Sequence, residues 1–273
     1  MTIQSDWVTI PVAAADAVTP TTMPAWWARP ATEPARAGVL VLPEVFGVNA
    51  WVRSVADRLA QHGYAALAIS TFSRTAPQLE EGYDADGLAA GRLHRDQVTA
   101  SQLLADAAAA ASWLGDAHAA DGLAERRLGC VGFCFGGHLA MLAATLPAIA
   151  ATCDFYGARV AGFRPGAAVD AEGRMLEPAP APTLAEVARI PGRLWCFRGD
   201  ADPLIPPREV EAVAAALTQA NGGVDCLSPQ ARHRLLMAAG AGHGYLCEAR
   251  PDHRPEAAAA GWEAMLELFA RSL

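Results

Sequence analysis

Short, continuous apolar segments alternate with long alanine-rich segments along most of this chain of 273 residues. Continuous apolar segments of four to eight residues are typical of strands buried on both faces of a sheet. The alanine-rich segments have the length and the periodicity of helices. Repeated strand–helix–strand units form mainly parallel sheets. The alternation therefore predicts an α/β fold, with a mainly parallel central sheet and helices on both of its faces.

The chain order of these segments gives the expected elements. We expect strands over residues 7–12, 37–42, 64–69, 128–133, 150–156, 193–197 and 234–238. We expect helices over residues 51–61, 97–114, 136–145, 209–219 and 256–271, with weaker helical patterns at 88–95 and 184–189. A chain of this length and composition can form one large core, so we predict a single domain over residues 1–273.

Residues 158–191 depart from this alternation. The segment is rich in glycine and contains five prolines, at positions 165, 178, 180, 182 and 191. A loop of this length inside a compact domain is usually a lid or the wall of a pocket. We therefore predict a lid-like insertion at about residues 158–191.

Composition excludes several classes of partner. A net charge of −8 and a pI near 5.3 provide no basic surface for nucleic acid or an acidic membrane. The N-terminal residues lack the pattern of a signal peptide, and no apolar run approaches the ~18 residues of a membrane span. Four of the six cysteines lie in or at the end of strand-like apolar segments, which is typical of reduced core cysteines, and the absence of a C-x-x-C pair argues against a zinc site. We expect a cytoplasmic protein.

The segment Gly132-Phe-Cys-Phe-Gly136 has the form of a nucleophile elbow, G-x-S-x-G, with cysteine in place of serine. The nucleophile of such an elbow lies in a strained turn, and the glycines let the chain reverse without steric clashes. Backbone N–H groups and the dipole of the following helix favour a thiolate there. Cys134 is therefore a candidate nucleophile. The alternative is an inert, buried cysteine between glycines.

Two later motifs contain the partners that such a nucleophile needs. Asp200 and Asp202 follow one predicted strand, and His243 lies between two glycines after the next strand. The order of nucleophile, acid and histidine is that of α/β-hydrolase triads. Either aspartate could be the acid, and either could instead cap the helix that follows. We interpret the remaining histidines, His138 among them, as structural or surface residues.

These motifs, with one nearer the N-terminus, resemble those of the dienelactone hydrolase family of α/β-hydrolases. The resemblance covers about residue 36 to the C-terminus and is interrupted mainly by the insertion. The matching segments are Glu44-Val-Phe-Gly-Val-Asn49, Gly63-Tyr-Ala-Ala66, Gly132-Phe-Cys-Phe-Gly-Gly137, Phe155-Tyr-Gly157, Gly199-Asp-Ala-Asp-Pro-Leu-Ile-Pro206 and Ala241-Gly-His-Gly244. The resemblance implies the α/β-hydrolase fold and cleavage of an ester or lactone.

The resemblance also implies roles for particular residues. The family pattern G-x-x-D-x-x-x-P selects Asp202 over Asp200 as the acid. The family's glutamate, which binds the resting thiol until substrate frees the thiolate, corresponds to Glu44, although a residue at a strand end could also be an ordinary surface residue. The implied catalytic residues are Cys134, Asp202, His243 and Glu44, and the implied oxyanion hole consists of the backbone N–H groups of Val45 and Phe135.

One departure from the family concerns the substrate. Family members that cleave dienelactone bind the substrate carboxylate with arginines, one of them four residues after the histidine. Cys247 occupies that position here, and the nearest arginine is Arg250. A second arginine could correspond to Arg92 or Arg95, and Tyr245 could line the pocket, so Arg92 and Tyr245 are the candidate substrate-binding residues. Without a bidentate arginine, planar recognition of a carboxylate is lost, so the chemistry carries over better than the substrate.

The sequence thus predicts a hydrolase that cleaves a small ester or lactone through an acyl-thioester on Cys134, without a metal or other cofactor. An alternative is a carboxylesterase or thioesterase for an uncharged substrate, with a pocket shaped by residues 158–191. A further alternative is a non-catalytic binding protein, in which Cys134 would react no faster than Cys226. The oligomeric state is left open.

Overall fold

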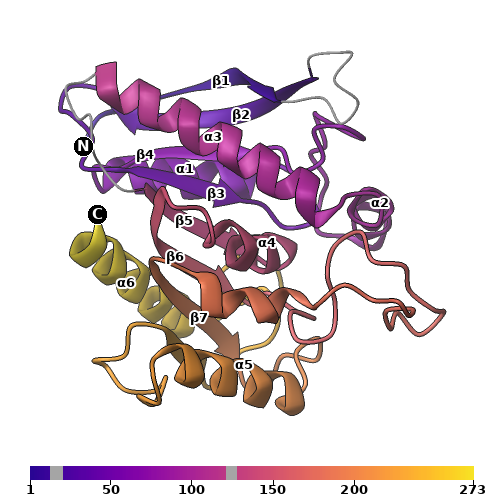
Figure 1. Ribbon diagram of the computed structural model, residues 1–273. Helices are drawn as coiled ribbons and strands as arrows, with labels where there is room; N and C mark the ends of the chain where they lie inside the picture. The colour runs from indigo at the N-terminus through magenta and orange to yellow at the C-terminus, as the bar shows by residue number, and fades with distance from the viewer. Residues whose placement is uncertain (13–20, 121–127) are drawn as a thin grey trace.

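The computed structural model describes residues 1–12, 21–120 and 128–273 of the chain. Within these ranges, eight strands form one sheet in the order β1-β2-β4-β3-β5-β6-β7-β8 (Figure 1). Strand β2 is antiparallel to both of its neighbours, β1 and β4, whereas every pair from β4 to β8 is parallel. The predicted α/β fold with a mainly parallel sheet is confirmed.

The observed strands lie close to the predicted segments, apart from one addition near the N-terminus. Strands β3 to β6 are buried along their whole length, as their continuous apolar sequences predict. The strands are β1 (Ile3–Val12), β2 (Thr21–Pro30), β3 (Gly38–Leu42), β4 (Ala65–Ile69), β5 (Leu128–Phe133), β6 (Ile149–Phe155), β7 (Arg193–Gly199) and β8 (Arg234–Ala238).

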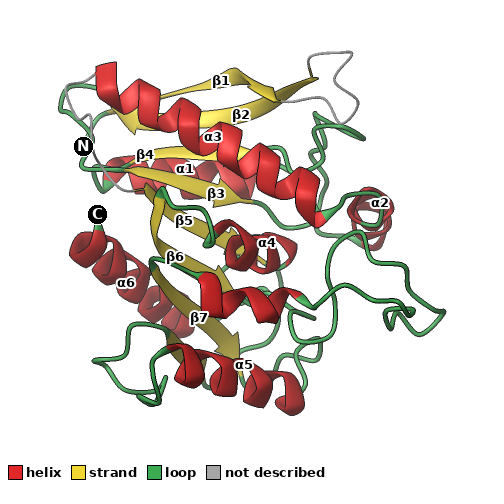
Figure 2. Cartoon of the chain, in the orientation of Figure 1, coloured by secondary structure: helices red, strands yellow, loops and turns green. Residues whose placement is uncertain are grey.

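Helices cover both faces of the sheet (Figure 2). Side chains of α1 and α6 share one core with the sheet. Side chains of α3, α4 and α5 form the cores on the opposite face. The helices are α1 (Ala50–Gln61), α2 (Ala85–Arg95), α3 (Ala100–Ala120), α4 (Phe135–Ala143), α5 (Pro207–Ala220) and α6 (Pro255–Ser272), with a 3-10 helix, η1, at Thr183–Arg189.

Strand β2 is absent from the sequence-based prediction, because two of its ten residues are prolines, which are uncommon inside a sheet. Its two tryptophans point to opposite faces. The Trp26 indole N–H donates to Asp57 of α1 at 2.9 Å, and the Trp27 ring packs edge-on against Trp113 of α3, with ring centroids 4.8 Å apart. Each tryptophan therefore joins the sheet to one helix layer.

The segment at residues 158–191 leaves β6 and returns to β7, and both of its ends are tied to α4. His138 of α4 is buried, and burial lowers its pKa to about 4, so the ring is neutral. Its Nδ1 donates to the carbonyl of Ala158 at 2.9 Å, and its Nε2 accepts from the hydroxyl of Thr183 at 2.7 Å. Most of residues 167–181 are exposed and project away from the sheet (Figure 1). Their role as a lid stays a prediction.

Candidate active site

Four of the predicted residues lie in loops at one edge of the sheet. Glu44 follows β3, Cys134 follows β5, Asp202 follows β7 and His243 follows β8. Because these strands are parallel, their carboxyl ends meet at the same edge, where open α/β sheets place their ligand sites. The topology therefore gathers residues that are far apart in the sequence.

The turn that carries Cys134 has the strained geometry of a nucleophile elbow. Cys134 has φ of 54° and ψ of −115°, a conformation that costs a residue other than glycine on the order of 1–3 kcal/mol. A Cβ on Gly132 would lie 1.9 Å from the carbonyl oxygen of Gly136, and a Cβ on Gly136 would lie 2.1 Å from that of Leu42. The N–H of Cys134 donates to the carbonyl of Phe155 at 3.0 Å. All six cysteines lie in described residues, and Cys134 is the one that is partly exposed.

His243 is held by Asp202 and not by Asp200. Its Nδ1 donates to Oδ2 of Asp202 at 2.8 Å. The second oxygen of Asp202 accepts from the N–H of Leu204 at 2.8 Å, so both carboxylate oxygens are fixed. Asp200 is exposed and instead accepts from the N–H of Gly240 at 2.7 Å. The geometry therefore gives Asp202 the position of the acid.

The imidazole of His243 lies close enough to Cys134 for the charges of the two groups to interact. Burial alone lowers the pKa of His243, but the nearby Cys134 thiolate and the Asp202 carboxylate outweigh burial and raise this pKa to about 10. Its Nε2 is buried and makes no hydrogen bond within the described residues. The ring of Tyr156 packs edge-on against the imidazole, with centroids 5.2 Å apart. These contacts therefore favour the protonated imidazole of His243.

We expect His243 to make the free energy of unfolding depend on pH above neutrality. Its folded-state pKa of about 10 lies above the ordinary value of 6.5, so folding strengthens proton binding there. This stabilisation is fully present below pH 6.5 and is lost as the pH rises through about 10. In urea unfolding of wild type and His243→Gln, the difference between the two free energies should shrink over this range. A constant difference would contradict the assignment. The arginines, which provide all 21 basic side chains, keep their charge throughout.

Glu44 is fully buried and is paired with Arg250. The Arg250 Nη1 donates to Oε1 of Glu44 at 3.0 Å, whereas Oε2 has no hydrogen-bond partner within the described residues. Burial raises the pKa of Glu44, and the charges of Arg250 and His243 oppose that rise. The guanidinium lies against Gly244, where a Cβ would be 2.6 Å from its central carbon. Glu44 is therefore not a surface residue.

We expect Arg250→Met to lower the free energy of unfolding by about 3 kcal/mol, because it leaves a buried carboxylate without its partner. Adding Glu44→Gln should recover part of that loss, which a double-mutant cycle in urea would measure. Arg174→Met is the matched control, since Arg174 pairs with carboxylates at the exposed tip of the insertion and should cost less than about 1 kcal/mol. Equal losses in the Arg250 and Arg174 variants would contradict the expected coupling.

Val45 and Phe135 flank the turns that carry Glu44 and Cys134. Phe135 is the first residue of α4, and its ring stacks on Phe72 with centroids 6.0 Å apart. Helix α2 packs on Val45 so closely that a Cβ on Gly91 would lie 2.1 Å from the Val45 carbonyl oxygen. Outside regular helices and strands, no backbone acceptor is recorded among the described residues for the N–H of Val45 or Phe135. An oxyanion hole formed by these groups stays a prediction.

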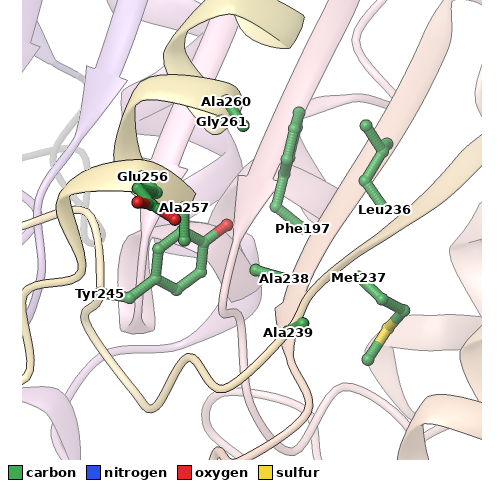
Figure 3. Close-up of a pocket in the computed structure, with 10 residues that line it drawn as sticks. All are labelled: Phe197, Leu236, Met237, Ala238, Ala239, Tyr245, Glu256, Ala257, Ala260 and Gly261. Atoms are coloured by element: carbon green, nitrogen blue, oxygen red, sulfur yellow. The ribbon is translucent and has the colours of Figure 1, made fainter.

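The two predicted substrate-binding residues are placed differently. Arg92 is exposed on α2, and Arg95, one turn later, pairs with the aspartate that follows it. Tyr245 is 1% exposed and packs edge-on against Tyr156. Figure 3 shows Tyr245 among the residues that line a hollow of about 300 Å³ beside β8 and α6. The substrate-binding roles of Arg92 and Tyr245 stay predictions.

Sequence reasoning assigned no role to Arg250 or Tyr156, which lie at the centre of the site. Arg250 lies three positions after Cys247, and Cys247 occupies the position of the family's arginine. A usable signal is Gly244, which has φ of +81° and leaves room for the guanidinium. Tyr156 lies within the family motif at residues 155–157. Its contact with His243 forms only when β6 and the loop after β8 come together in the fold.

The mainly parallel sheet, the strained cysteine turn after β5 and the Asp–His pair after β7 and β8 are features of the α/β-hydrolase class. A solved structure from Klebsiella pneumoniae, described as a "Putative Dienelactone Hydrolase", superposes with a TM-score of 0.77 at 27% identity over 99% of both chains. The model of the dienelactone hydrolase family matches residues 23–273. The chain belongs to the dienelactone hydrolase family.

Relatives in sequence support the same family. A Synechocystis protein named "Putative carboxymethylenebutenolidase" is 34% identical over 235 residues, which cover 86% of each chain. A Bradyrhizobium protein named "Probable 2-oxo-3-(5-oxofuran-2-ylidene)propanoate lactonase" is 29% identical over 261 residues, covering 96% of this chain and 92% of the relative. This protein is an ester or lactone hydrolase of that family. In the described part of the chain, no helix has the length and apolarity needed to span a bilayer.

Proposed function

We propose that the protein cleaves a small ester or lactone, of the dienelactone type, through an acyl-thioester on Cys134. The observation that carries this proposal is the arrangement of His243. One ring nitrogen is held by Asp202 at 2.8 Å, and the nearby Cys134 thiolate contributes to the raised pKa of the ring. An imidazole fixed in this way by a carboxylate serves as the base for a thiol and then as an acid.

The proposed reaction has two halves. The Cys134 thiolate attacks the carbonyl carbon, the C–O bond breaks, and His243 gives its proton to the leaving oxygen, which stays tethered to the acyl group when the substrate is a lactone. His243 then takes a proton from water, whose oxygen attacks the thioester carbon and breaks the C–S bond. The carboxylic acid product loses its proton at neutral pH, and the thiolate–imidazolium pair is restored.

The N–H groups of Phe135 and Val45 are the proposed donors to the oxyanion of each tetrahedral intermediate. The Phe135 N–H lies at the first position of α4, where the helix dipole adds positive potential. Removal of one such donor typically raises the barrier by about 3 kcal/mol. Glu44 is the proposed gate of the thiol, and it lies close enough for its charge to interact with that of His243.

We further propose that Arg250 supplies the positive charge for an anionic substrate. Its guanidinium is mostly buried, with 16% of the side chain exposed, and it reaches Glu44 beside the site. The family position four residues after the histidine holds Cys247, which is neutral, because burial raises the pKa of its thiol to about 12. A substrate carboxylate would compete with Glu44 for Arg250.

A second candidate, an esterase or thioesterase for uncharged substrates, is favoured by the same ion pair. Arg250 is already neutralised by Glu44, and Arg92 is exposed on α2. In this case the site offers less free positive charge to a substrate carboxylate, and residues 158–191 would shape an apolar pocket.

Further proposals concern the domain organisation, the cellular location and the role of residues 158–191. The protein is proposed to be a single domain that acts in the cytoplasm on a small molecule, without a cofactor. All six cysteines are free thiols, which fits a reducing compartment. Residues 158–191 are proposed to act as a lid, supported by their exposed tip and their anchored ends.

The two candidates differ in their preference for charge, so kcat/KM should be compared on a dienelactone carboxylate, its methyl ester, p-nitrophenyl acetate and an acetyl thioester. If Arg250 binds the carboxylate, the anion should be preferred over its methyl ester by about tenfold or more, the value of one charge-assisted hydrogen bond. Arg250→Gln should abolish that preference. Faster turnover of the uncharged compounds would favour the second candidate, and no turnover of any of the four would refute both.

A further inference from the structure

Between the strands that carry Cys134 and Asp202, two charged side chains are completely buried. Asp154 of β6 and Arg198 of β7 both have 0% side-chain exposure. The Arg198 Nη2 donates to Oδ2 of Asp154 at 2.5 Å, and its Nη1 donates to the carbonyls of Asp154 at 3.0 Å and Phe197 at 3.1 Å. Burial disfavours the charged guanidinium, but Asp154 outweighs burial and raises the pKa of Arg198. Burial also raises the pKa of Asp154, and the charge and hydrogen bonds of Arg198 oppose that rise.

Asp154 contacts the beginning of α4, the helix that follows the Cys134 turn. Its Oδ1 accepts from the N–H of Gly157 at 2.9 Å. A Cβ on Gly137 of α4 would lie 2.6 Å from this same oxygen, so the carboxylate touches the helix that begins after Cys134. The next residue, Phe155, accepts the hydrogen bond from the Cys134 N–H at 3.0 Å. A shift of Asp154 would therefore move the elbow.

On the other side, Arg198 directly precedes the loop that carries the acid. The following residue, Gly199, is so close to the histidine loop that a Cβ would lie 2.1 Å from the carbonyl oxygen of Ala241. The N–H of Ala201 donates to that carbonyl at 3.1 Å. Ala241 stands two residues before His243, so the acid loop and the histidine loop meet just after Arg198.

A third connection runs through the carbonyl of Phe197. It accepts from Arg198 Nη1 at 3.1 Å and from the N–H of Tyr156 at 2.8 Å. The Tyr156 ring packs against the imidazole of His243. The guanidinium thus shares an acceptor with the residue that supports one side of the histidine ring.

We propose that the Asp154–Arg198 pair positions the triad by holding the Cys134 turn in register with the loops of Asp202 and His243. This inference rests on the proposed function of that site. Stability alone does not account for the pair, because replacing a buried ion pair by uncharged groups of similar volume is often neutral or stabilising. Both residues are positioning residues, since neither touches the reacting atoms. A displacement of about 1 Å in such a site can lower the rate about 10²-fold.

The test separates the position of the triad from the stability of the fold. Asp154→Asn and Arg198→Met each leave one buried group without its partner, whereas the double variant removes both charges and keeps an oxygen for the Gly157 N–H. Three quantities should be measured below the unfolding temperature: the free energy of unfolding in urea, kcat with KM, and the rate of Cys134 alkylation by iodoacetamide against pH. The control is Asp106→Asn/Arg74→Met, which removes another ion pair with a buried carboxylate; it joins α3 to the loop after β4, and neither of these elements carries a triad residue.

We expect the double variant to regain most of the stability lost by the single variants, while its kcat stays at least about tenfold below wild type. KM should change little, and alkylation of Cys134 near neutral pH should slow, because the sulfur and the imidazole no longer align. The control should keep the wild-type kcat and profile. A stable double variant with both at wild-type values would overturn the proposal.

A substitute variant and a measurement on wild type complete the test. Glu209 of α5 also interacts with the charge of Arg198, so the double variant could fail to fold. Arg198→Lys then replaces it, because lysine keeps the charge but has one nitrogen in place of the two that bond Asp154 and both carbonyls. An unchanged kcat and alkylation profile in a folded Arg198→Lys would overturn the proposal. If wild-type Cys134 itself alkylates no faster than Cys226, the proposed function fails, which is a different result from failure of the pair.

Discussion

Replacement of Cys134 by alanine is expected to lower kcat on any accepted ester or lactone by about 10⁴-fold or more. Alanine cannot form the acyl intermediate, and only the oxyanion donors and substrate binding would remain. Cys134→Ser should also lose most turnover, because a hydroxyl is a far poorer nucleophile than a thiol at neutral pH. Single-turnover kinetics, with mass spectrometry of the acylated peptide, would measure both effects.

Cys226→Ala is the matched control for this prediction. Cys226 is 1% exposed and belongs to the core formed by α4, α5 and η1. Its replacement should lower stability slightly and leave kcat unchanged. Wild-type turnover by Cys134→Ala, or an acyl group found on another cysteine, would remove Cys134 from the mechanism.

Asp202→Asn is expected to lower kcat by about 10³–10⁴-fold while leaving the fold intact. One oxygen of residue 202 accepts from the N–H of Leu204, so an asparagine would keep its carbonyl there and turn its NH₂ toward Nδ1 of His243. The imidazole would then carry its proton on Nε2, the nitrogen that must accept a proton from the thiol or from water. A wrong tautomer of this kind has an effect of this size in serine-protease triads.

The neighbouring aspartate provides the control. Asp200→Asn removes a charge from the same loop but changes only an exposed side chain bonded to Gly240. Its kcat should remain within about twofold of wild type, as for surface substitutions that leave the site untouched. The pH dependence of kcat in both variants would complete the comparison. If Asp200→Asn were the more damaged variant, the assignment of the acid would be reversed.

The architecture was largely predictable because the strands are buried on both faces. Continuous apolar segments such as residues 128–133 identified β5 within its observed bounds, and the helix predicted over residues 51–61 corresponds to α1. Strand β2 was missed, because its prolines conceal a strand that is defined only by pairing with β1 and β4. Local sequence does not predict pairing between strands that are far apart in the chain.

The candidate site was predictable where a local motif carries the geometry. The glycines that flank Cys134 predict its strained turn, and His243 lies in an equally local motif. The Glu44–Arg250 and Asp154–Arg198 pairs were not predictable, because each joins loops or strands that are adjacent only after folding. A charged residue in a strand-like segment, such as Asp154, indicates a buried partner. It does not identify that partner.

The two hydrogen bonds of His138 have a consequence for how this family can diversify. Because one imidazole joins Ala158 to Thr183, the gap that the intervening chain must bridge is set by α4 and not by the chain's own length. Doubling the length of a flexible loop costs only about 0.6 kcal/mol in closure entropy. The length and sequence of this stretch can therefore change while the loops that carry Cys134, Asp202 and His243 keep their shape.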